Sequence, residues 1–202
     1  MTRIARLVVL AAMAALALSS TAHAVTWHNS GSTAFTATGG PGTLSSTSAA
    51  LACSGTTGTG TATAAPFVGA TWSAFHGTVS FTGCLVSGIT TGVECGFTMT
   101  ATTAVAGGIG GTFDVTCGIF QFGTKICHIG GSLEGTYVNP VQPSTKGRFT
   151  LNTGGSLVMS NGAAGVCPLG NGDRGHLAEK ALTITTATGG SGTLGPVLTR
   201  TA

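Results

Sequence analysis

Charged side chains are scarce in this sequence. Its 202 residues include eight Lys and Arg and only five Asp and Glu, and together these make up 6% of the chain. Nucleic acids are held by clusters of Lys and Arg against their phosphates, so this composition excludes an electrostatic nucleic-acid surface. We therefore expect no nucleic-acid partner, and Thr, Ser and Gly must cover most of the surface.

The motifs of several enzyme classes are also missing. No serine lies in a G-x-S-x-G sequence, which excludes the nucleophile elbow of the α/β-hydrolases. Neither H-E-x-x-H nor C-x-x-C occurs, so we expect no zinc site, no redox pair and no cofactor. Beyond the N-terminal segment the histidines stand singly, at His28, His76, His128 and His176. A glycosidase needs two facing carboxylates, and Asp114 and Glu134 are the pair that neighbouring segments could bring together.

One long apolar run is present, and it lies at the N-terminus. Residues 1–24 combine a short basic region, an apolar region over residues 7–18 and the small-residue sequence Ala22-His23-Ala24. About 12 apolar residues cannot cross a hydrocarbon core of roughly 30 Å, so the pattern predicts a cleaved signal peptide. We expect a single domain over residues 25–202 without a membrane span, secreted and either free or loosely attached to the cell surface.

All six cysteines follow the leader, and an even count in an exported chain predicts three disulfides. The segments GTVSFTGC, which ends at Cys84, and GTFDVTC, which ends at Cys117, form a weak repeat. Each is followed by another cysteine at similar spacing. We therefore favour pairing within each repeat, which gives Cys84–Cys95, Cys117–Cys127 and Cys53–Cys167. The alternative is sequential pairing, which gives Cys53–Cys84, Cys95–Cys117 and Cys127–Cys167.

Helix signals are nearly absent, and apolar and polar residues alternate instead. In GTVSF, Val79 and Phe81 share one face, and in FTMTAT, Phe97, Met99 and Ala101 share one face. Period-2 alternation is typical of antiparallel strands with one buried and one polar face. A third copy of the repeat, GRFTLNTGG, begins at Gly147 without a cysteine. The sequence predicts an all-β fold, a single antiparallel β-sandwich or barrel with three disulfides.

The stretch 39–65 has almost no large side chains, and we expect part of it to be a low-complexity loop. Within it, Thr57 to Thr63 alternate with Gly and Ala, which indicates a flexible or edge strand. The alternative is a flat face of hydroxyls and methyls that matches an ordered surface such as ice or a crystalline polysaccharide. Such a face requires the Thr-x-Thr step in register across several strands, and we expect only Thr98-Met99-Thr100 and Thr183-Ile184-Thr185 to join it.

The segment VCPLGNGDRGHLAEK, residues 166–180, concentrates the remaining charge. Removal of Arg3 and Arg6 with the leader leaves eleven charged residues, and four of these lie in this segment. Its glycines and Asp173 predict a polar turn that enters the last strand. A binding role for Asp173, Arg174 and His176 is the alternative. The single calcium-nonapeptide-like stretch lacks the stacked copies that bind the ion, so we expect no metal.

The most distinctive stretches of the chain are CHIGGSLEGTY from Cys127 and CPLGNGD from Cys167. With these stretches, its composition, its even cysteine count and its leader, the chain resembles uncharacterised small exported β-proteins of high-GC Gram-positive bacteria. That resemblance implies no known activity. The enediyne-binding apoproteins are similar in composition and in their disulfide-linked β-sandwich, but share no residue motif with this chain.

Trp27, Trp72 and Tyr137 are the only Trp and Tyr, and we expect the two Trp in the core, which leaves few aromatic platforms for glycans. We predict a non-enzymatic binding or structural protein with an extracellular or cell-envelope partner. The alternatives are a secreted hydrolase with an unrecognised site and a carrier of a small ligand in a Gly-lined space between sheets.

Overall fold

The computed structural model describes residues 25–201 except 143, 153–155, 164, 166, 178–179 and 187–194, and the predicted leader lies outside the described residues. Every regular element in this part of the chain is a strand, and every ladder is antiparallel. The all-β prediction is confirmed. No helix among the described residues is long and apolar enough to cross a membrane.

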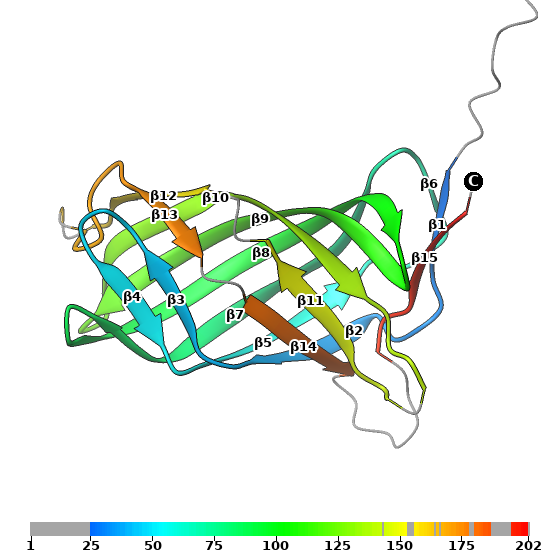
Figure 1. Cartoon of the computed structure of the whole chain (residues 1–202), viewed down its shortest axis with the longest axis horizontal. Coiled ribbons are helices and arrows are strands. Elements are labelled where there is room, and N and C mark those ends of the chain that lie inside the picture. The colour runs from blue at the N-terminus through cyan, green and yellow to red at the C-terminus, as the bar shows by residue number, and fades with distance from the viewer. Residues whose placement is uncertain are drawn as a thin grey trace, which may run out of the picture.

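Four long strands form one wall of the molecule (Figure 1). They follow one another along the chain and pair in the order β7–β8–β9–β10. Two-residue turns at Ser87-Gly88 and Phe122-Gly123 close the β7–β8 and β9–β10 hairpins, so each of the two cysteine-containing copies of the sequence repeat is one hairpin. The third copy, from Gly147, instead pairs with residues 135–138 and 180–184. The long strands are β7 (Trp72–Val86), β8 (Ile89–Val105), β9 (Gly108–Gln121) and β10 (Thr124–Val138).

Eight short strands complete the wall in two groups. At one end lie β2 (Ala34–Gly39), β5 (Gly55–Ala62), β11 (Gly147–Leu151) and β14 (Lys180–Thr186). At the other end lie β3 (Gly42–Ser45), β4 (Ala50–Cys53), β12 (Ser156–Asn161) and β13 (Arg174–Leu177). Each group links β10 back to β7, through β11–β14–β2–β5 in the first case and β12–β13–β3–β4 in the second.

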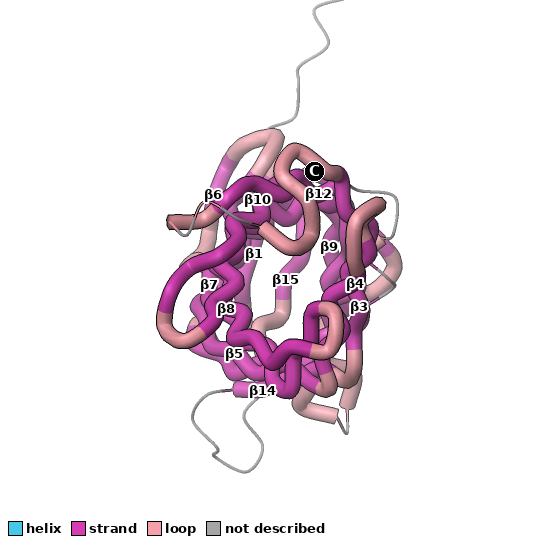
Figure 2. Tube along the Cα trace, turned by 90° about the vertical axis from the view of Figure 1, so that its left-hand side faces the viewer, coloured by secondary structure: helices cyan, strands magenta, loops and turns pink. Residues whose placement is uncertain are grey.

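The ladders therefore close into a ring at each end of the molecule, and we call this closed wall the barrel. Viewed along the long axis, the strands surround a common centre (Figure 2). The same four chain segments supply both short groups: β2 leads into β3, β4 into β5, β11 into β12 and β13 into β14. The chain leaves the strand conformation midway along the barrel at residues 40–41, at Ser54 and at Asn152, and we call that level the strand break.

A small sheet covers one end of the barrel. It consists of β1 (Thr26–Asn29), β6 (Phe67–Val68) and β15 (Leu198–Thr201), in the order β15–β1–β6. Trp27 in this sheet packs on Trp72 with ring centroids 6.1 Å apart, and both rings are buried. The Tyr137 hydroxyl donates a hydrogen bond to the Pro196 carbonyl, and burial raises the pKa of this phenol far above its ordinary value. The expected core positions of the two Trp are confirmed.

The core has two different halves. Towards the capped end, Phe35, Phe75, Phe149 and Tyr137 form a cluster of edge-to-face and tilted ring pairs. Towards the other end the core has no such cluster among the described residues, and all three disulfides lie there. Each aromatic pair stabilises the folded chain by roughly 0.5–1.5 kcal/mol beyond the burial of its surface, whereas a disulfide acts mainly by restricting the unfolded chain.

The favoured disulfide pairing was wrong. The structure contains Cys53–Cys84, Cys95–Cys117 and Cys127–Cys167, which is the sequential alternative. The tight hairpin turns explain the difference, because they place Thr91 opposite Cys84 and Ile119 opposite Cys127. Cys95 and Cys117 instead lie directly opposite each other on β8 and β9. Three disulfides fit a protein outside the cytoplasm.

Residues 46–49 and 63–65 are loop, as expected for part of 39–65, but the prediction of a flexible or edge strand within this stretch is wrong. Most of this stretch is strand, in β3, β4 and β5, and β5 pairs on both sides with β2 and β7 rather than lying at an edge. Its glycines make room for the aromatic half of the core. A Cβ on Gly60 would lie 2.5 Å from Cζ of Phe35, so the alternation of Thr and Gly places threonine outside and space for a ring inside.

Candidate functional site: an apolar cavity inside the barrel

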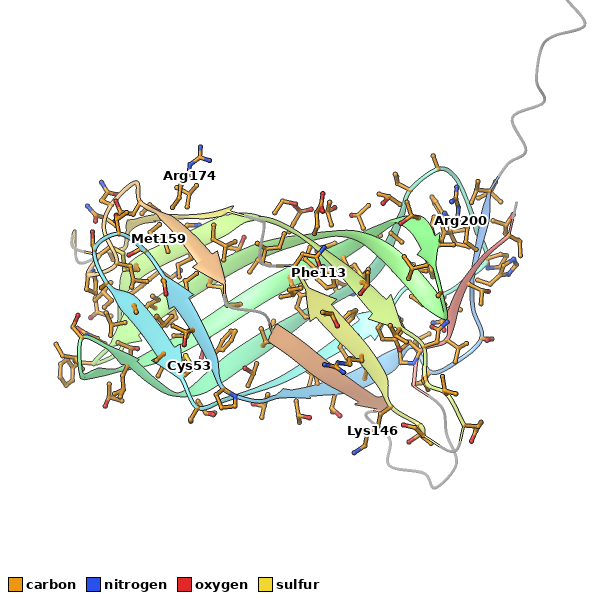
Figure 3. The ribbon with its side chains drawn as sticks, in the orientation of Figure 1. Cys53, Phe113, Lys146, Met159, Arg174 and Arg200 are labelled. Atoms are coloured by element: carbon orange, nitrogen blue, oxygen red, sulfur yellow. A yellow bond between two sulfur atoms is a disulfide. The ribbon has the colours of Figure 1, made fainter. Side chains whose placement is uncertain are left out.

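A cavity of about 80 Å³ lies inside the barrel. Its lining comes from all four long strands and from β3, β4, β11 and β12. Four lining residues stand at or next to the strand break, namely Gly42, Cys53, Leu151 and Leu157. The cavity therefore lies midway along the barrel, where the two halves of the core meet. Figure 3 labels two of its lining residues, Phe113 on the long-strand wall and Cys53 at the end of β4.

The lining of the cavity is apolar. Among the described residues it includes four phenylalanines and no charged side chain, and almost none of its surface is polar. Phe81, Phe97 and Val115 are only partly buried although they line the interior, which shows that part of their surface borders the cavity. A group in this site would meet hydrocarbon on nearly every side, so the site is suited to apolar ligands.

The end of the barrel opposite the cap is closed by the loop between β12 and β13. Leu169 in this loop is fully buried, and the Cys127–Cys167 disulfide joins the loop to β10. The Ser46 hydroxyl donates a hydrogen bond to the Leu169 carbonyl at 2.7 Å. We call residues 167–173 the plug loop.

Asp173 holds the plug loop on the turn between β3 and β4. Its carboxylate accepts hydrogen bonds from the hydroxyls of Thr47 and Ser48, the latter at 2.7 Å. These bonds lower the pKa of Asp173, because they stabilise the ionised carboxylate. A Cβ on Gly170 would collide with both the Asp173 carboxylate and the Ser48 hydroxyl, so this glycine keeps the contact open.

The other two predicted binding residues do not join Asp173 in a cluster that the structure describes. Arg174 is exposed, opposes Val158 in the ladder, and points away from the barrel in Figure 3. The backbone of His176 pairs with Ser45, and its side chain lies outside the described part of the chain, as does Glu179. The Asp173 carboxylate accepts its hydrogen bonds from the distant β3–β4 turn, a contact that the prediction of a local polar turn did not include.

The carboxylate pair considered for hydrolysis lies on the outer surface. Asp114 on β9 opposes Ser132, and Glu134 on β10 opposes Thr112, so the two acids are diagonal neighbours and both are exposed. Neither lines the cavity. Among the described residues, no three or more His, Cys, Asp and Glu gather as they would around a metal ion.

The threonines of β5 form rows with their neighbours on the outer surface. Thr36, Thr59 and Thr78 lie in one row of the ladder, and Thr38, Thr57 and Ser80 lie in the next. The Thr-x-Thr step is in register across β14, β2 and β5, since Thr183 opposes Thr38 and Thr185 opposes Thr36, whereas Thr98 on β8 opposes His76. These rows run around a closed wall, and neighbouring strands in sheets are rotated by roughly 20–25°, so the hydroxyls do not share a flat plane.

One alternative from the sequence was a carrier that holds a small ligand in a Gly-lined space, but the cavity has a different lining. The cavity is bordered by Phe, Val and Leu, with Gly42 the one lining glycine among the described residues. The sequence signal for this lining was the alternation of apolar and polar residues, which placed Val79, Phe97 and Phe113 on apolar faces. The alternation does not show which of these faces meet around an incompletely filled space.

Comparison of the chain with protein-family models, with curated proteins and with solved structures gives no match. Function must therefore be argued from the chemistry of the cavity and of the surface.

Proposed function

We propose that this chain is a non-enzymatic exported binding protein that holds a small apolar molecule in the cavity of its barrel. The observation that supports this most directly is the partial exposure of Phe81, Phe97 and Val115 towards an interior space whose lining is almost wholly apolar. Apolar surface that borders an interior space gains free energy when an apolar group covers it, by roughly 25 cal/mol per Å².

The architecture supports the same function. Closed barrels of eight strands have an interior that side chains fill or that holds one small ligand. Here the interior is filled near both ends and open in the middle. Among the residues that the structure describes, the cavity lining offers no ionisable side chain, whereas a hydrolase needs a convergent nucleophile, base or acid. Binding without chemistry is the activity that fits this lining.

The proposal is tested by titrating the mature chain with xenon and with 1-pentanol, two small apolar probes. Saturable binding should shift the amide NMR signals of residues around Val93 and Val115 and should raise the melting temperature progressively, with the logarithm of ligand concentration once this exceeds the dissociation constant. The variant Val93→Phe should weaken binding at least tenfold, because Val93 lines the cavity and is 3% exposed.

The matched control is Val158→Phe. Val158 lies on the outer face of β12 and is 45% exposed, so a phenylalanine at this position does not reach the cavity. Its affinity should equal that of the unmodified chain, and circular dichroism should show both variants folded. Absence of saturable binding to either probe, or equal loss in the two variants, would show that the cavity is not a binding site.

A further inference from the structure

Exposed apolar side chains gather at the capped end of the barrel. Eight large apolar residues of the described chain are exposed, and four of these lie at this end. Phe67 and Val68 form β6, at one edge of the small sheet, and Val68 is 61% exposed. Val138 ends β10, and Val141, which is 70% exposed, lies in the loop that follows.

The loop after β10 belongs to the same end, because hydrogen bonds attach it to the small sheet. The Asn139 side chain donates a hydrogen bond to the Leu198 carbonyl and accepts one from the Leu198 N–H, both at 2.8 Å, so it extends the sheet beyond β15. The Gly195 N–H donates a further hydrogen bond to the Thr145 carbonyl at 3.0 Å. The exposed valines at and after the end of β10 therefore lie at one edge of the small sheet, and β6 lies at the other.

The described charges at this end are all positive. Arg200 on β15, Arg148 opposite Val138, and Lys146 just before β11 are exposed. Figure 3 shows Arg200 at the small sheet and Lys146 in the half of the barrel nearest to that sheet. The Arg200 guanidinium lies 5.3 Å from the centre of the Trp27 ring, and this cation–π contact keeps it on the cap.

The four described acids lie elsewhere. Asp173 holds the plug loop at the opposite end, and Glu94, Asp114 and Glu134 stand within the long strands. Along its strand, Glu134 is the one nearest the capped end, and it precedes the end of β10 by four residues, or about 13 Å. This separation exceeds the Debye length of about 8 Å at physiological ionic strength, so the charge of Glu134 is largely screened from the cap. Residues 187–194, which the structure does not describe, contain no charged side chain.

The opposite end differs in its charge. Its hairpin turns also carry exposed apolar side chains, at Leu85, Ile89 and Phe122. The cations there, Lys125 and Arg174, are accompanied by the Asp173 carboxylate. Among the described residues, the capped end alone combines exposed apolar side chains with cations that no acid opposes.

We propose that the capped end docks this protein on an anionic lipid surface. Lys146, Arg148 and Arg200 lie against the headgroup phosphates, to which an anionic leaflet attracts them. Val68 and Val141, at the two edges of the small sheet, enter the boundary between headgroups and acyl chains, where apolar side chains leave water.

The valines distinguish a lipid surface from an anionic polymer. A polymer such as polyphosphate engages the cations but leaves the valines in water, so their exposure beside the cations favours a lipid partner. The docking surface and the cavity use different residues, and the docking proposal does not depend on a ligand in the cavity.

The first experiment measures sedimentation of the mature chain with vesicles of equal parts phosphatidylcholine and phosphatidylglycerol. Lys146→Gln with Arg148→Gln should weaken binding about 25-fold, since each cation contributes roughly fivefold. Lys125→Gln with Arg174→Gln removes the same charge from the opposite end and should change the affinity by less than about twofold. Equal losses in the two double variants, or equal binding to vesicles of phosphatidylcholine alone, would overturn the proposal.

The second experiment tests the apolar contact. Val68→Thr with Val141→Thr keeps the shape of both side chains and should weaken binding to the mixed vesicles several-fold, without weakening binding to soluble polyphosphate. Leu85→Thr with Ile89→Thr, at the opposite end, is the matched control and should weaken neither. If the valine variant binds vesicles as the unmodified chain does, the cations alone carry the interaction and the lipid proposal fails.

The third experiment reports which end meets the lipid. Trp27 and Trp72 are the only tryptophans, and they pack together beneath the small sheet. Vesicles with bromine on the acyl chains close to the headgroups should quench their fluorescence, and Phe122→Ser should change neither affinity nor quenching. Binding without quenching would show contact through another face and overturn the proposal. Val93→Phe, which fills the cavity, should bind vesicles normally, so failure of the cavity function and failure of docking are seen separately.

Discussion

The Ser48 hydroxyl donates a hydrogen bond to the Asp173 carboxylate at 2.7 Å, although the two residues are 125 positions apart in the chain. Together with the bond from Thr47, this contact attaches the plug loop to the β3–β4 turn and so helps to close one end of the barrel. The dense run of charge near the C-terminus thus contains a structural contact between distant loops.

Asp173→Ala should lower the melting temperature by a few degrees, because both serine and threonine hydroxyls lose their acceptor. Asp114→Asn removes the same charge from an exposed position on β9 and should leave the melting temperature unchanged. Differential scanning calorimetry of the two variants checks this. A cycle of Asp173→Ala with Ser48→Ala should show that the two losses are not additive.

Acid should weaken the same contact. The pKa of Asp173 is lower in the folded chain than in the unfolded chain, because the two hydroxyls stabilise the carboxylate. Its contribution to stability is therefore complete above the ordinary Asp pKa of about 4 and is lost as the pH falls through the lower, folded-state pKa. Unfolding by urea between pH 7 and pH 2 should show this loss in the unmodified chain and a smaller one in Asp173→Ala. Identical pH profiles of the two proteins would show that the loss of stability in acid does not come from the Asp173 contact.

Disulfide mapping of the unreduced protein by mass spectrometry should find Cys53–Cys84, Cys95–Cys117 and Cys127–Cys167. Detection of a peptide that joins Cys84 to Cys95 would contradict the register of the β7–β8 hairpin. Replacement of Cys95 and Cys117 together by alanine should cost about 2–4 kcal/mol of unfolding free energy, since it frees a loop of the unfolded chain.

Two glycines on neighbouring parts of the wall should respond oppositely to alanine. Gly60 faces the core, and a Cβ there would lie 2.5 Å from both the Phe35 ring and the His76 carbonyl, so Gly60→Ala should destabilise by about 1–3 kcal/mol. Gly96 has open space around it, so Gly96→Ala should be neutral or stabilise by about 0.5 kcal/mol. Chemical denaturation measures both, and a comparable loss at the two positions would refute the inward orientation of Gly60.

The β9–β10 turn carries a phenylalanine in an unfavourable conformation. Phe122 has a φ of 48°, is fully exposed, and precedes Gly123 with a φ of 79°. Two residues with positive φ define the type I′ turn, which favours Asn-Gly. Phe122→Asn should raise the unfolding free energy by on the order of 1 kcal/mol. Ser87→Asn in the equivalent β7–β8 turn should give a smaller gain, because serine is not bulky; a loss of stability in Phe122→Asn would mean that the ring has a stabilising contact.

The sequence by itself determined the all-β class and, in the segments with clear alternation, which face of the strand is buried. Alternation of Val79 with Ser80, and of Phe113 with Asp114, is a local pattern, and the pleat of a strand converts it directly into an inward and an outward side. The lack of clustered charge likewise excluded whole classes of site without any knowledge of the fold. The repeat was local too in its two cysteine-containing copies, since each of these is one β-turn-β unit.

Only the tertiary structure decided the pairings between distant segments. Cys84 and Cys95 are close in the chain, but a two-residue turn sets a register that keeps them apart. Asp173 looked like a local turn residue, and its partners come from a loop more than a hundred positions earlier. The cavity arises in the same way. It is the space left where side chains from eight strands meet at the strand break, and the shape of that space depends on ring closure and register rather than on any one strand.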